Sequence, residues 1–450
     1  MHFWSDTQLR TIVIVSLFSS VLGFCALVGV ARYKGLDPIH LTGDSKAYVI
    51  LANNIINHGV YSVSMTEPFS PESFRAPGYP AFLSILFTIV PWPLAALFVH
   101  ALISGLAPIL LYLFARPFHE RAAFWAAILF SLDPVRLFLA ASFLTDSLFV
   151  VLFFTSLVAL EKGKESTKFL VLSALFLGLA ILVRPIAQFL PLLYAAYLLA
   201  TIQPVRKAAL MGLLLVAVAY LVVAPWAYRN HRLFDSWNVS SIGAANLAIY
   251  NAPEFLKWSP DAHAEARLAS FQLEQNALPY HEALSLARSD VFVSTFRDVI
   301  RGHEFSYLVF HVVKTIPFFV TDGLRDTIRL FDVDIGTMPN ISGALMRGDI
   351  ALLLTYVLSG GLPIALLVLG SGFWSLVSVL FVSEAVRSFI RRDLFPLFLT
   401  LLVCYFAFLT GPVSNARYRL PIEGFIFFLG ALELYQWHSV RRSAVRDENN

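Results

Sequence analysis

Two acidic residues beside hydrophobic segments are the first features of this chain that could carry chemistry. Asp44 lies in a polar segment after the first hydrophobic run, and Asp146 lies where a later run begins. Acidic groups at membrane depth are costly and commonly functional. Either aspartate could instead be a helix N-cap, because Asp is among the preferred N-cap residues. On the residues alone, both interpretations of Asp44 stay open.

Several arginines accompany these carboxylates and could bind phosphate groups. Arg75 precedes a turn in which Pro77 and Pro80 each fix a backbone dihedral, so the turn can hold the arginine in one place. Taken singly, any of these arginines could instead contact lipid headgroups. On one face of a membrane with two carboxylates, they suit an anionic lipid-phosphate substrate. The other arginines of this set are Arg184, Arg417 and Arg419.

The elements that must position these residues are membrane helices. The chain has 450 residues, of which 58% are hydrophobic and 14% charged, and its mean hydropathy is +0.70. Soluble domains do not have this composition. Because a spanning helix needs roughly 20 apolar residues, we predict one all-α, polytopic membrane domain over residues 1–450 with about 12 transmembrane helices. The predicted spans are 11–31, 93–115, 122–140, 143–160, 169–183, 187–203, 208–228, 304–320, 350–369, 371–388, 395–411 and 419–437.

Basic residues in short joints set the expected orientation. They collect in every second joint, and the positive-inside rule places such joints and both termini in the cytoplasm. The two long polar segments, 32–77 and 229–303, then face the periplasm of a bacterial inner membrane or the cell exterior. Residues 438–450 form a cytoplasmic tail. The segment 322–349 has balanced charge and fits either side.

The first long segment carries a helical pattern of its own. Apolar residues recur at i, i+3, i+4 and i+7 between Tyr48 and Ile55. This spacing predicts an amphipathic helix at the outer membrane surface, beginning near residues 42–44 and ending at Gly59. The following run, 78–90, is too short to cross comfortably and indicates an interfacial or re-entrant segment.

Other ligand classes find little support. Cys25 and Cys404 both fall inside predicted spans, so we expect no disulfide. The net charge of +3 forms no basic stripe, which argues against nucleic-acid binding. His40 and His58 flank Asp44, but no third metal ligand accompanies them. The sequence therefore identifies no cofactor, and a divalent metal, although possible, has no support from the spacing of ligands.

Motifs in a fixed order carry a family resemblance over nearly the whole chain. The chain resembles the GT-C superfamily of polytopic membrane glycosyltransferases, in the group of the dolichyl-phosphate-mannose protein mannosyltransferases and the bacterial lipid A aminoarabinose transferases. Each motif alone is weak, but the ordered set is fairly specific. The matching motifs are Asp44-Ser45-x-x-Tyr48, Arg75-x-Pro77-Gly78-Tyr79-Pro80, Thr145-Asp146, Arg184-Pro185, Pro225-Trp226-x-x-Arg229-Asn230 and Arg417-Tyr418-Arg419-Leu420-Pro421.

The resemblance implies a reaction and its partners. A sugar would leave a polyprenyl-phosphate carrier for an acceptor hydroxyl, with inversion at the anomeric carbon and without a nucleotide. The acceptor could be a glycan, a lipid or a protein.

The resemblance also implies roles for individual residues. Asp44 would be the general base that accepts the proton of the attacking hydroxyl. Asp146, Tyr48 and Tyr79 would position the acceptor or shape the site. The carrier phosphate would be bound by Arg417, Arg419, Arg75 and Arg184, with Arg417 and Arg419 as the preferred pair.

The main alternative is a transporter or flippase for a lipid-linked sugar, which also has about 12 spans. A carrier is expected to place ionisable groups near the bilayer midplane, often in two related halves. Here the predicted spans 187–203, 208–224 and 395–411 are nearly free of charge, and no repeat relates the two halves. The sequence therefore favours a transferase.

Overall fold

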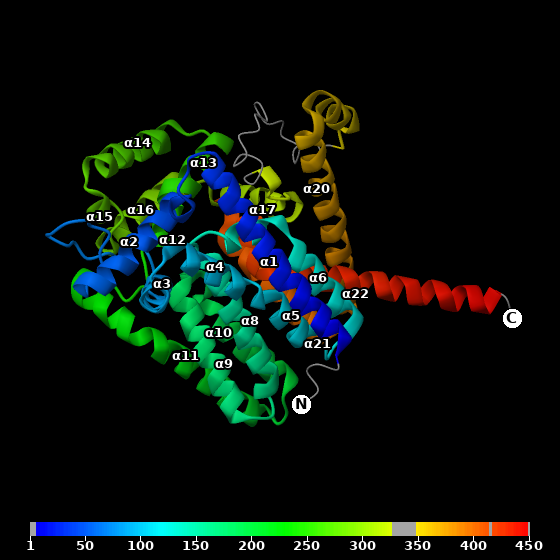
Figure 1. Cartoon of the computed structure of the whole chain (residues 1–450). Helices are drawn as coiled ribbons and strands as arrows, with labels where there is room; N and C mark the ends of the chain where they lie inside the picture. The colour runs from blue at the N-terminus through cyan, green and yellow to red at the C-terminus, as the bar shows by residue number, and fades with distance from the viewer. Residues whose placement is uncertain (1–5, 326–347, 414–415, 449–450) are drawn as a thin grey trace.

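The computed structural model describes residues 6–325, 348–413 and 416–448 (Figure 1). Every regular element among these residues is a helix, which confirms the predicted all-α class. Most of 322–349, the segment with balanced charge, lies outside the described residues. The first helices are α1 (Thr7–Tyr33), α2 (Gly43–His58), α3 (Gly78–Ile89), α4 (Pro93–Ser104), α5 (Leu106–Ala115), α6 (Glu120–Leu132), α7 (Pro134–Ala140), α8 (Thr145–Gly163), α9 (Thr167–Val183), α10 (Leu190–Thr201) and α11 (Val205–Phe234). The later helices are α12 (Ile242–Asn246), the π-helical turn η4 (Leu247–Asn251), α13 (Ala252–Trp258), α14 (Ala262–Ala277), α15 (Tyr280–Ala283), α16 (Ser289–Ile300), α17 (Glu304–Val320), α20 (Ile350–Arg391), α21 (Leu394–Thr410) and α22 (Ala416–Glu448).

Four described segments are long and apolar enough to cross a membrane: α1, the α4–α5 pair, α11, and Ile364–Arg391 of α20. The α6–α7 pair is a fifth candidate, bent by 57° at its break. Shorter apolar helices include α3, α9, α10 with the 3-10 turn before it, and α21. Every predicted span overlaps a helix, which confirms the polytopic class. The number of crossings, about 12 from the sequence, stays a prediction.

The break in α20 differs from the prediction. The sequence predicts two spans, 350–369 and 371–388, divided near residue 370. In the structure the helix instead breaks at Gly361, with φ 63° and ψ −158°. Only glycine adopts this conformation readily. Ile364–Arg391 is therefore one long helical segment, and the segment before it is short.

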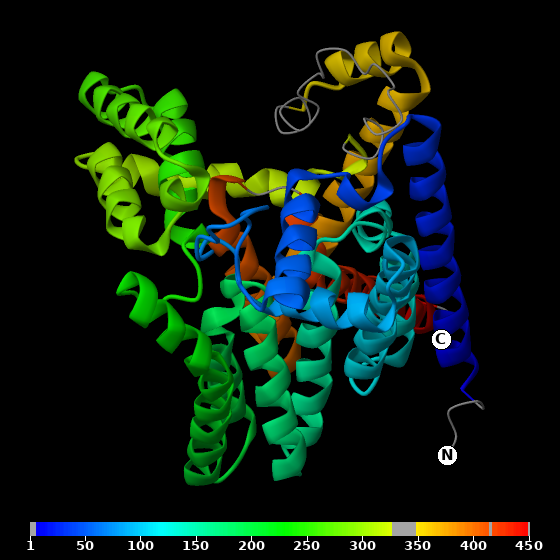
Figure 2. The same ribbon diagram turned by 60° about the vertical axis from the view of Figure 1, so that its left-hand side comes forward.

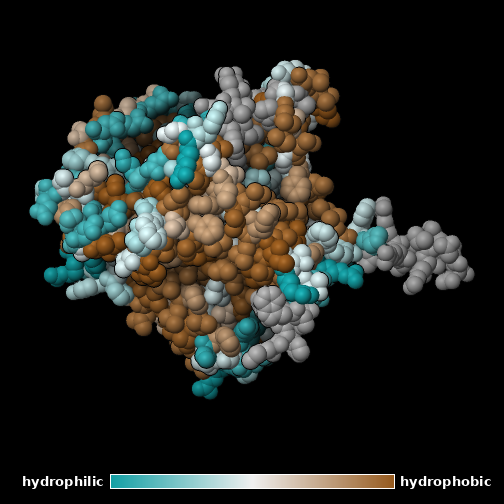
Figure 3. Space-filling view, in the orientation of Figure 1, coloured by the Kyte–Doolittle hydropathy of each residue, from teal (hydrophilic) through white to brown (hydrophobic). Residues whose placement is uncertain are grey.

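The two ends of the helical bundle differ in charge. α8 runs from the turn that contains Asp146 to Lys162, roughly 24 Å away at about 1.5 Å per residue. At the Lys162 end of the bundle, Arg116 pairs with Asp6 beside the N-terminus at 3.1 Å. We call the end where α8 and α22 begin the site end, and the opposite end the basic end. A broad hydrophobic surface separates hydrophilic side chains at these two ends (Figure 3).

α22 and α17 depart from the expected layout. The α22 backbone stays helical to Glu448, through most of the predicted tail at 438–450. α17 has the predicted bounds of 304–320, but it runs across the view in Figure 2 whereas α8, α9 and α10 run down it. Phe305 and Leu308 of α17 are exposed, which is typical of a helix at a membrane interface. This helix is therefore not aligned with the spans.

The second long polar segment folds into an outer group of helices, α12 to α16 (residues 242–300), beside the site end. The outer group has a hydrophobic core of its own, built from side chains such as Phe255, Phe271 and Phe292, with Phe310 of α17. Its surface over α14 is hydrophilic in Figure 3. This core holds the outer group as a unit that can present side chains to the site end.

Candidate active site

Asp44 lies in the first turn of α2 without capping that helix. Thr42 is the N-cap: its hydroxyl accepts a hydrogen bond from the Ser45 N–H, and the Ser45 hydroxyl accepts one from the Thr42 N–H, both at 3.0 Å. This reciprocal capping box satisfies two of the free N–H groups at the start of the helix. The interpretation of Asp44 as the N-cap is therefore wrong. Its carboxylate is 45% exposed and is available for other contacts.

The loop before α3 fixes Arg75. The Glu72 carboxylate accepts hydrogen bonds from two backbone N–H groups, one of them that of Arg75, and the Tyr61 hydroxyl donates to the Arg75 carbonyl. Gly78 lets the next turn approach the end of α9 closely, because a Cβ there would lie 2.8 Å from the Leu182 carbonyl. The predicted turn thus holds Arg75 at the end of α9 that precedes Arg184.

Asp146 is fully buried between two of the predicted arginines. One oxygen of its carboxylate pairs with Arg184 Nη1. The other accepts hydrogen bonds from Arg417 Nε and Nη2 at 3.1 and 3.0 Å. A buried carboxylate needs such partners, because an unpaired charge is costly away from water. α8, α9 and α22 are joined through this one side chain.

Arg417 joins the two aspartates. Its Nη1 lies 3.7 Å from Asp44 Oδ2, while Arg75 Nη2 donates to Asp44 Oδ1 at 3.2 Å. Five of the predicted residues therefore meet, three arginines and two aspartates, and we call them the arginine–aspartate cluster. With all five ionised, the cluster carries one net positive charge. This arrangement suits an anionic ligand.

The two predicted tyrosines lie next to the cluster in different ways. The Arg75 guanidinium lies 5.6 Å from the centre of the Tyr48 ring, close enough for a cation–π contact. Burial raises the pKa of Tyr48 to about 12, with a nearby carboxylate adding to the effect, so its hydroxyl stays protonated at neutral pH. Tyr79 packs on Tyr48, but its hydroxyl lies 3.2 Å from His100 Nε2. Tyr79 supports the site and directs no polar atom into it.

Arg419 lies apart from the cluster, although the sequence pairs it with Arg417. It is fully buried, and its Nη1 donates to the carbonyl groups of Phe318 and Thr321 at 2.8 and 2.7 Å. Its guanidinium stacks on Trp374 at 3.4 Å from the ring centre. Residues two apart on a helix point in nearly opposite directions. Arg419 is therefore enclosed by backbone carbonyls and the Trp374 ring and does not reach the cleft beside Asp44.

An open cleft of about 710 Å³ lies beside Asp44. Tyr280 of the outer group closes one side, and its hydroxyl accepts a hydrogen bond from Arg75 Nη1. The sequence did not identify Tyr280, because the segment 229–303 carries no motif or spacing that singles it out. The cleft is lined by Gly43, Asp44, Lys46, Ala47, Ile50, Val63, Ser64, Arg75, Tyr280 and His281.

Comparison with known proteins gives a partial sequence match and a whole-chain structural match. Residues 74–228 match the family model described as dolichyl-phosphate-mannose-protein mannosyltransferase. No curated protein sequence matches the chain. An archaeal oligosaccharyltransferase from Archaeoglobus fulgidus, solved with an inhibitory peptide and a dolichol-phosphate, superposes with a TM-score of 0.54 at 16% identity and covers 99% of this chain. The chain has a GT-C fold.

Two further structures of the A. fulgidus enzyme share the GT-C fold with this chain. One, a complex with Zn and sulfate, has a TM-score of 0.51 at 16% identity over 94% of this chain. The other, tethered to an acceptor peptide containing the NVT sequon, has a TM-score of 0.54 at 16% identity over 99%. The chain covers 52% of the chain solved with dolichol-phosphate, 49% of the one with Zn and sulfate and 51% of the one with the tethered peptide, so it spans about half their length.

Guanidinium groups, rather than further carboxylates or histidines, surround the two aspartates of the cluster. The described residues hold no group of three or more His, Cys, Asp or Glu side chains arranged as ligands. Both Asp44 oxygens and both Asp146 oxygens already face guanidinium groups. Of the flanking histidines, His40 pairs through Nδ1 with Asp37 at 2.6 Å, and the His58 ring packs on Phe69.

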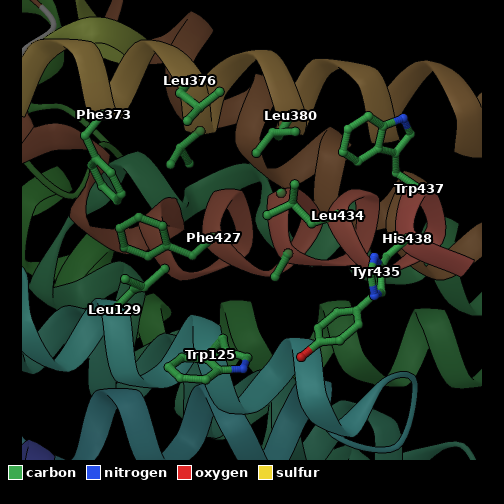
Figure 4. A pocket seen from close by; sticks show the side chains of 13 residues that line it. Trp125, Leu129, Phe373, Leu376, Leu380, Phe427, Leu434, Tyr435, Trp437 and His438 are labelled. Atoms are coloured by element: carbon green, nitrogen blue, oxygen red, sulfur yellow. The ribbon is translucent and has the colours of Figure 1, made fainter. Parts of the chain in front are cut away.

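A second cavity, of about 580 Å³, is open at the surface of the helical bundle between α6, α20 and α22, and Trp125 and Leu376 in its lining are exposed (Figure 4). Trp125 and Leu129 come from α6, and Phe373 and Leu376 come from α20; the Phe373 ring packs beside Phe427 of α22, with the ring centres 6.2 Å apart. The lining is almost wholly apolar and contains none of the predicted site residues. In a membrane such a surface is suited to a hydrocarbon chain.

Proposed function

We propose that this protein is a membrane glycosyltransferase that moves a sugar from a polyprenyl-phosphate carrier to an acceptor hydroxyl, with inversion. The environment of Asp44 is the main support for this function. Its side chain lines the cleft, and Arg75 and Arg417 each lie beside one of its two carboxylate oxygens. A general base must reach the proton of the attacking group, and this carboxylate is accessible and held in place. The GT-C fold and the partial family match add support.

The proposed chemistry gives the residues of the cluster three roles. Asp44 accepts the proton as the acceptor oxygen bonds to the anomeric carbon, and the bond from that carbon to the phosphate oxygen breaks, leaving its electron pair on the phosphate. Arg417, Arg75 and Arg184 stabilise the negative charge that develops there. Asp146 touches no substrate in this scheme, and it keeps Arg184 and Arg417 aimed at the phosphate.

We also propose an orientation for the protein in the membrane. The site end faces the periplasm of a bacterial inner membrane, and the basic end and both termini face the cytoplasm, in keeping with the positive-inside rule. The donor reaches the site end through the bilayer. The acceptor, an envelope glycan, lipid or protein, enters by the cleft between the first loop and the outer group.

Replacing the carboxylate of Asp44 tests the proposed base. Asp44→Asn is expected to lower the rate of transfer from a lipid-linked sugar by about 100-fold or more while leaving thermal unfolding unchanged, because general base catalysis supplies about that factor. Asp37→Asn removes a carboxylate from the same loop outside the cluster and should keep full activity. Full activity of Asp44→Asn would contradict its role as the general base. Movement of intact lipid-linked sugar across vesicle membranes without cleavage would contradict the proposed transferase activity and favour a transporter.

We also propose that transfer needs no divalent metal, because Arg417 supplies the positive charge between the two aspartates. Purified protein dialysed against EDTA should transfer sugar at its original rate, and added Mg²⁺ or Mn²⁺ should not raise it. Metal content measured in the same sample gives the control. Loss of activity with EDTA and recovery with a divalent ion would refute this proposal.

A further inference from the structure

The outer group contains a third cavity, of about 540 Å³, that adjoins the Asp44 cleft. Tyr280 lines both spaces, so its side chain stands between them. Its hydroxyl is bonded to Arg75. The cavity lies among η4, α14 and α15, in the outer group and outside the hydrophobic bundle.

The chemistry of this cavity differs from that of the cleft. The cleft presents the charged groups Asp44, Lys46 and Arg75, whereas no charged side chain lines the cavity. Its polar groups are instead three carboxamides on one face of α14, at spacings of i, i+3 and i+4. They are Gln272, Gln275 and Asn276.

Two of these carboxamides are free to bind a ligand. Gln275 is tied into the protein, since its Nε2 donates to the Ala283 carbonyl and its Oε1 accepts from Arg288 Nη2. Gln272 and Asn276 have no hydrogen-bond partner among the described residues. A carboxamide both donates and accepts hydrogen bonds, as the hydroxyl groups of a sugar do. Tyr280 beside them is exposed and offers an aromatic ring with a polar tip.

We propose that this cavity binds a neutral sugar unit of the acceptor, so that the acceptor is a glycan of at least two residues. The inference rests on the proposed function, because the reacting hydroxyl lies in the Asp44 cleft and the next sugar passes Tyr280 into the cavity. Gln272 and Asn276 bind the hydroxyl groups of that sugar. The absence of charge selects a neutral unit over an acidic one.

Binding of neutral trisaccharides to the full-length protein in nanodiscs tests the proposal. Saturation-transfer NMR titrations would use maltotriose, mannotriose and chitotriose, with trialanine as the peptide probe. At least one trisaccharide should bind, and Gln272→Ala with Asn276→Ala should weaken its binding by about 30-fold, because each lost hydrogen bond lowers the affinity roughly fivefold. Leu273→Ala is the matched control: it shortens an exposed side chain of α14 that does not line the cavity.

Each outcome has a distinct meaning. Binding that is weakened by the double variant and kept by Leu273→Ala and Asp44→Asn supports the cavity as a sugar site. The proposal is overturned if no trisaccharide binds, if the double variant binds as tightly as the original protein, or if trialanine alone binds. The transfer assay on Asp44→Asn remains separate, so failure of the sugar site and failure of the proposed reaction can be told apart.

Discussion

Arg417 is the residue on which the cluster depends, because it contacts both aspartates. Its Nε and Nη2 bond one oxygen of Asp146 while its Nη1 faces Asp44. A guanidinium offers this planar set of donors, whereas an ammonium is a compact point charge. The geometry of the site therefore depends on the arginine side chain as well as on its charge.

Arg417→Lys should therefore keep the charge and lose the activity. We expect transfer to fall roughly 100-fold, the size of effect seen when one stabilising donor is removed. Donor titration of the steady-state rate measures the effect. A variant that keeps its original kcat and KM would show that charge alone suffices.

Arg419→Lys is the matched control, two residues further along α22. Arg419 sits among backbone carbonyls and Trp374, away from the cluster. Its replacement should lower the melting temperature in detergent, because buried carbonyl partners are lost. The folded fraction of the Arg419→Lys protein should keep a kcat close to that of the original protein.

Sequence motifs identified most of the cluster, and the misses have physical causes. Asp44, Asp146 and Arg417 are each tied to an ordered motif, and they meet in the structure. The same motif includes Arg419, and motif membership does not report which side of a helix a residue faces. Tyr280 carries no local signal, because its place beside Arg75 depends on how the outer group packs.

At the scale of elements, the start of α2 sets the position of Asp44. The predicted helix begins and ends where the spacing indicates, from Gly43 to His58 with Gly59 in the left-handed region at φ 66°. Its first turn is held by Thr42 and Ser45, which leaves the Asp44 side chain outside the capping bonds. The capping box thus fixes the backbone of the proposed base.

Loss of that cap should reduce catalysis without touching a ligand. Thr42→Ala is expected to cost about 1 kcal/mol of helix-end stability and to lower kcat about fivefold, because a frayed turn holds Asp44 less firmly. KM for the donor should change little. Thr42→Ser restores the capping hydroxyl and should restore kcat. Equal losses in both variants would point to the methyl group instead of the cap.

Breaks between elements were harder to predict than the elements themselves. Hydropathy placed a boundary near residue 370, yet the backbone breaks at Gly361. An apolar run does not show which of its glycines will leave the helix, because that depends on neighbouring packing. The direction of α17 was also not predicted. Its bounds follow from the apolar composition, whereas its direction depends on contacts with α21 and α22.

For the whole molecule, the separation of the site end from the basic end predicts opposite exposure across the membrane. In a variant without Cys25 and Cys404, Met65→Cys should react with an impermeant maleimide from the periplasmic side only, and Glu165→Cys from the cytoplasmic side only. Both positions are exposed. Labelling of intact cells and of inverted vesicles measures the two sides. Reaction of both cysteines from one side would refute the orientation.

The single positive charge of the cluster has a consequence for turnover. In the proposed reaction, the incoming carrier is a phosphodiester with one negative charge, and the spent carrier is a phosphomonoester approaching two charges above its second pKa of about 6. By charge alone, three arginines should hold the spent form more tightly than the loaded form, so we expect its departure to be the slow step of the proposed reaction. If the proposed reaction holds, we expect spent carrier that accumulates in the bilayer to inhibit transfer, so that the rate of transfer would follow the rate at which the cell recycles its lipid.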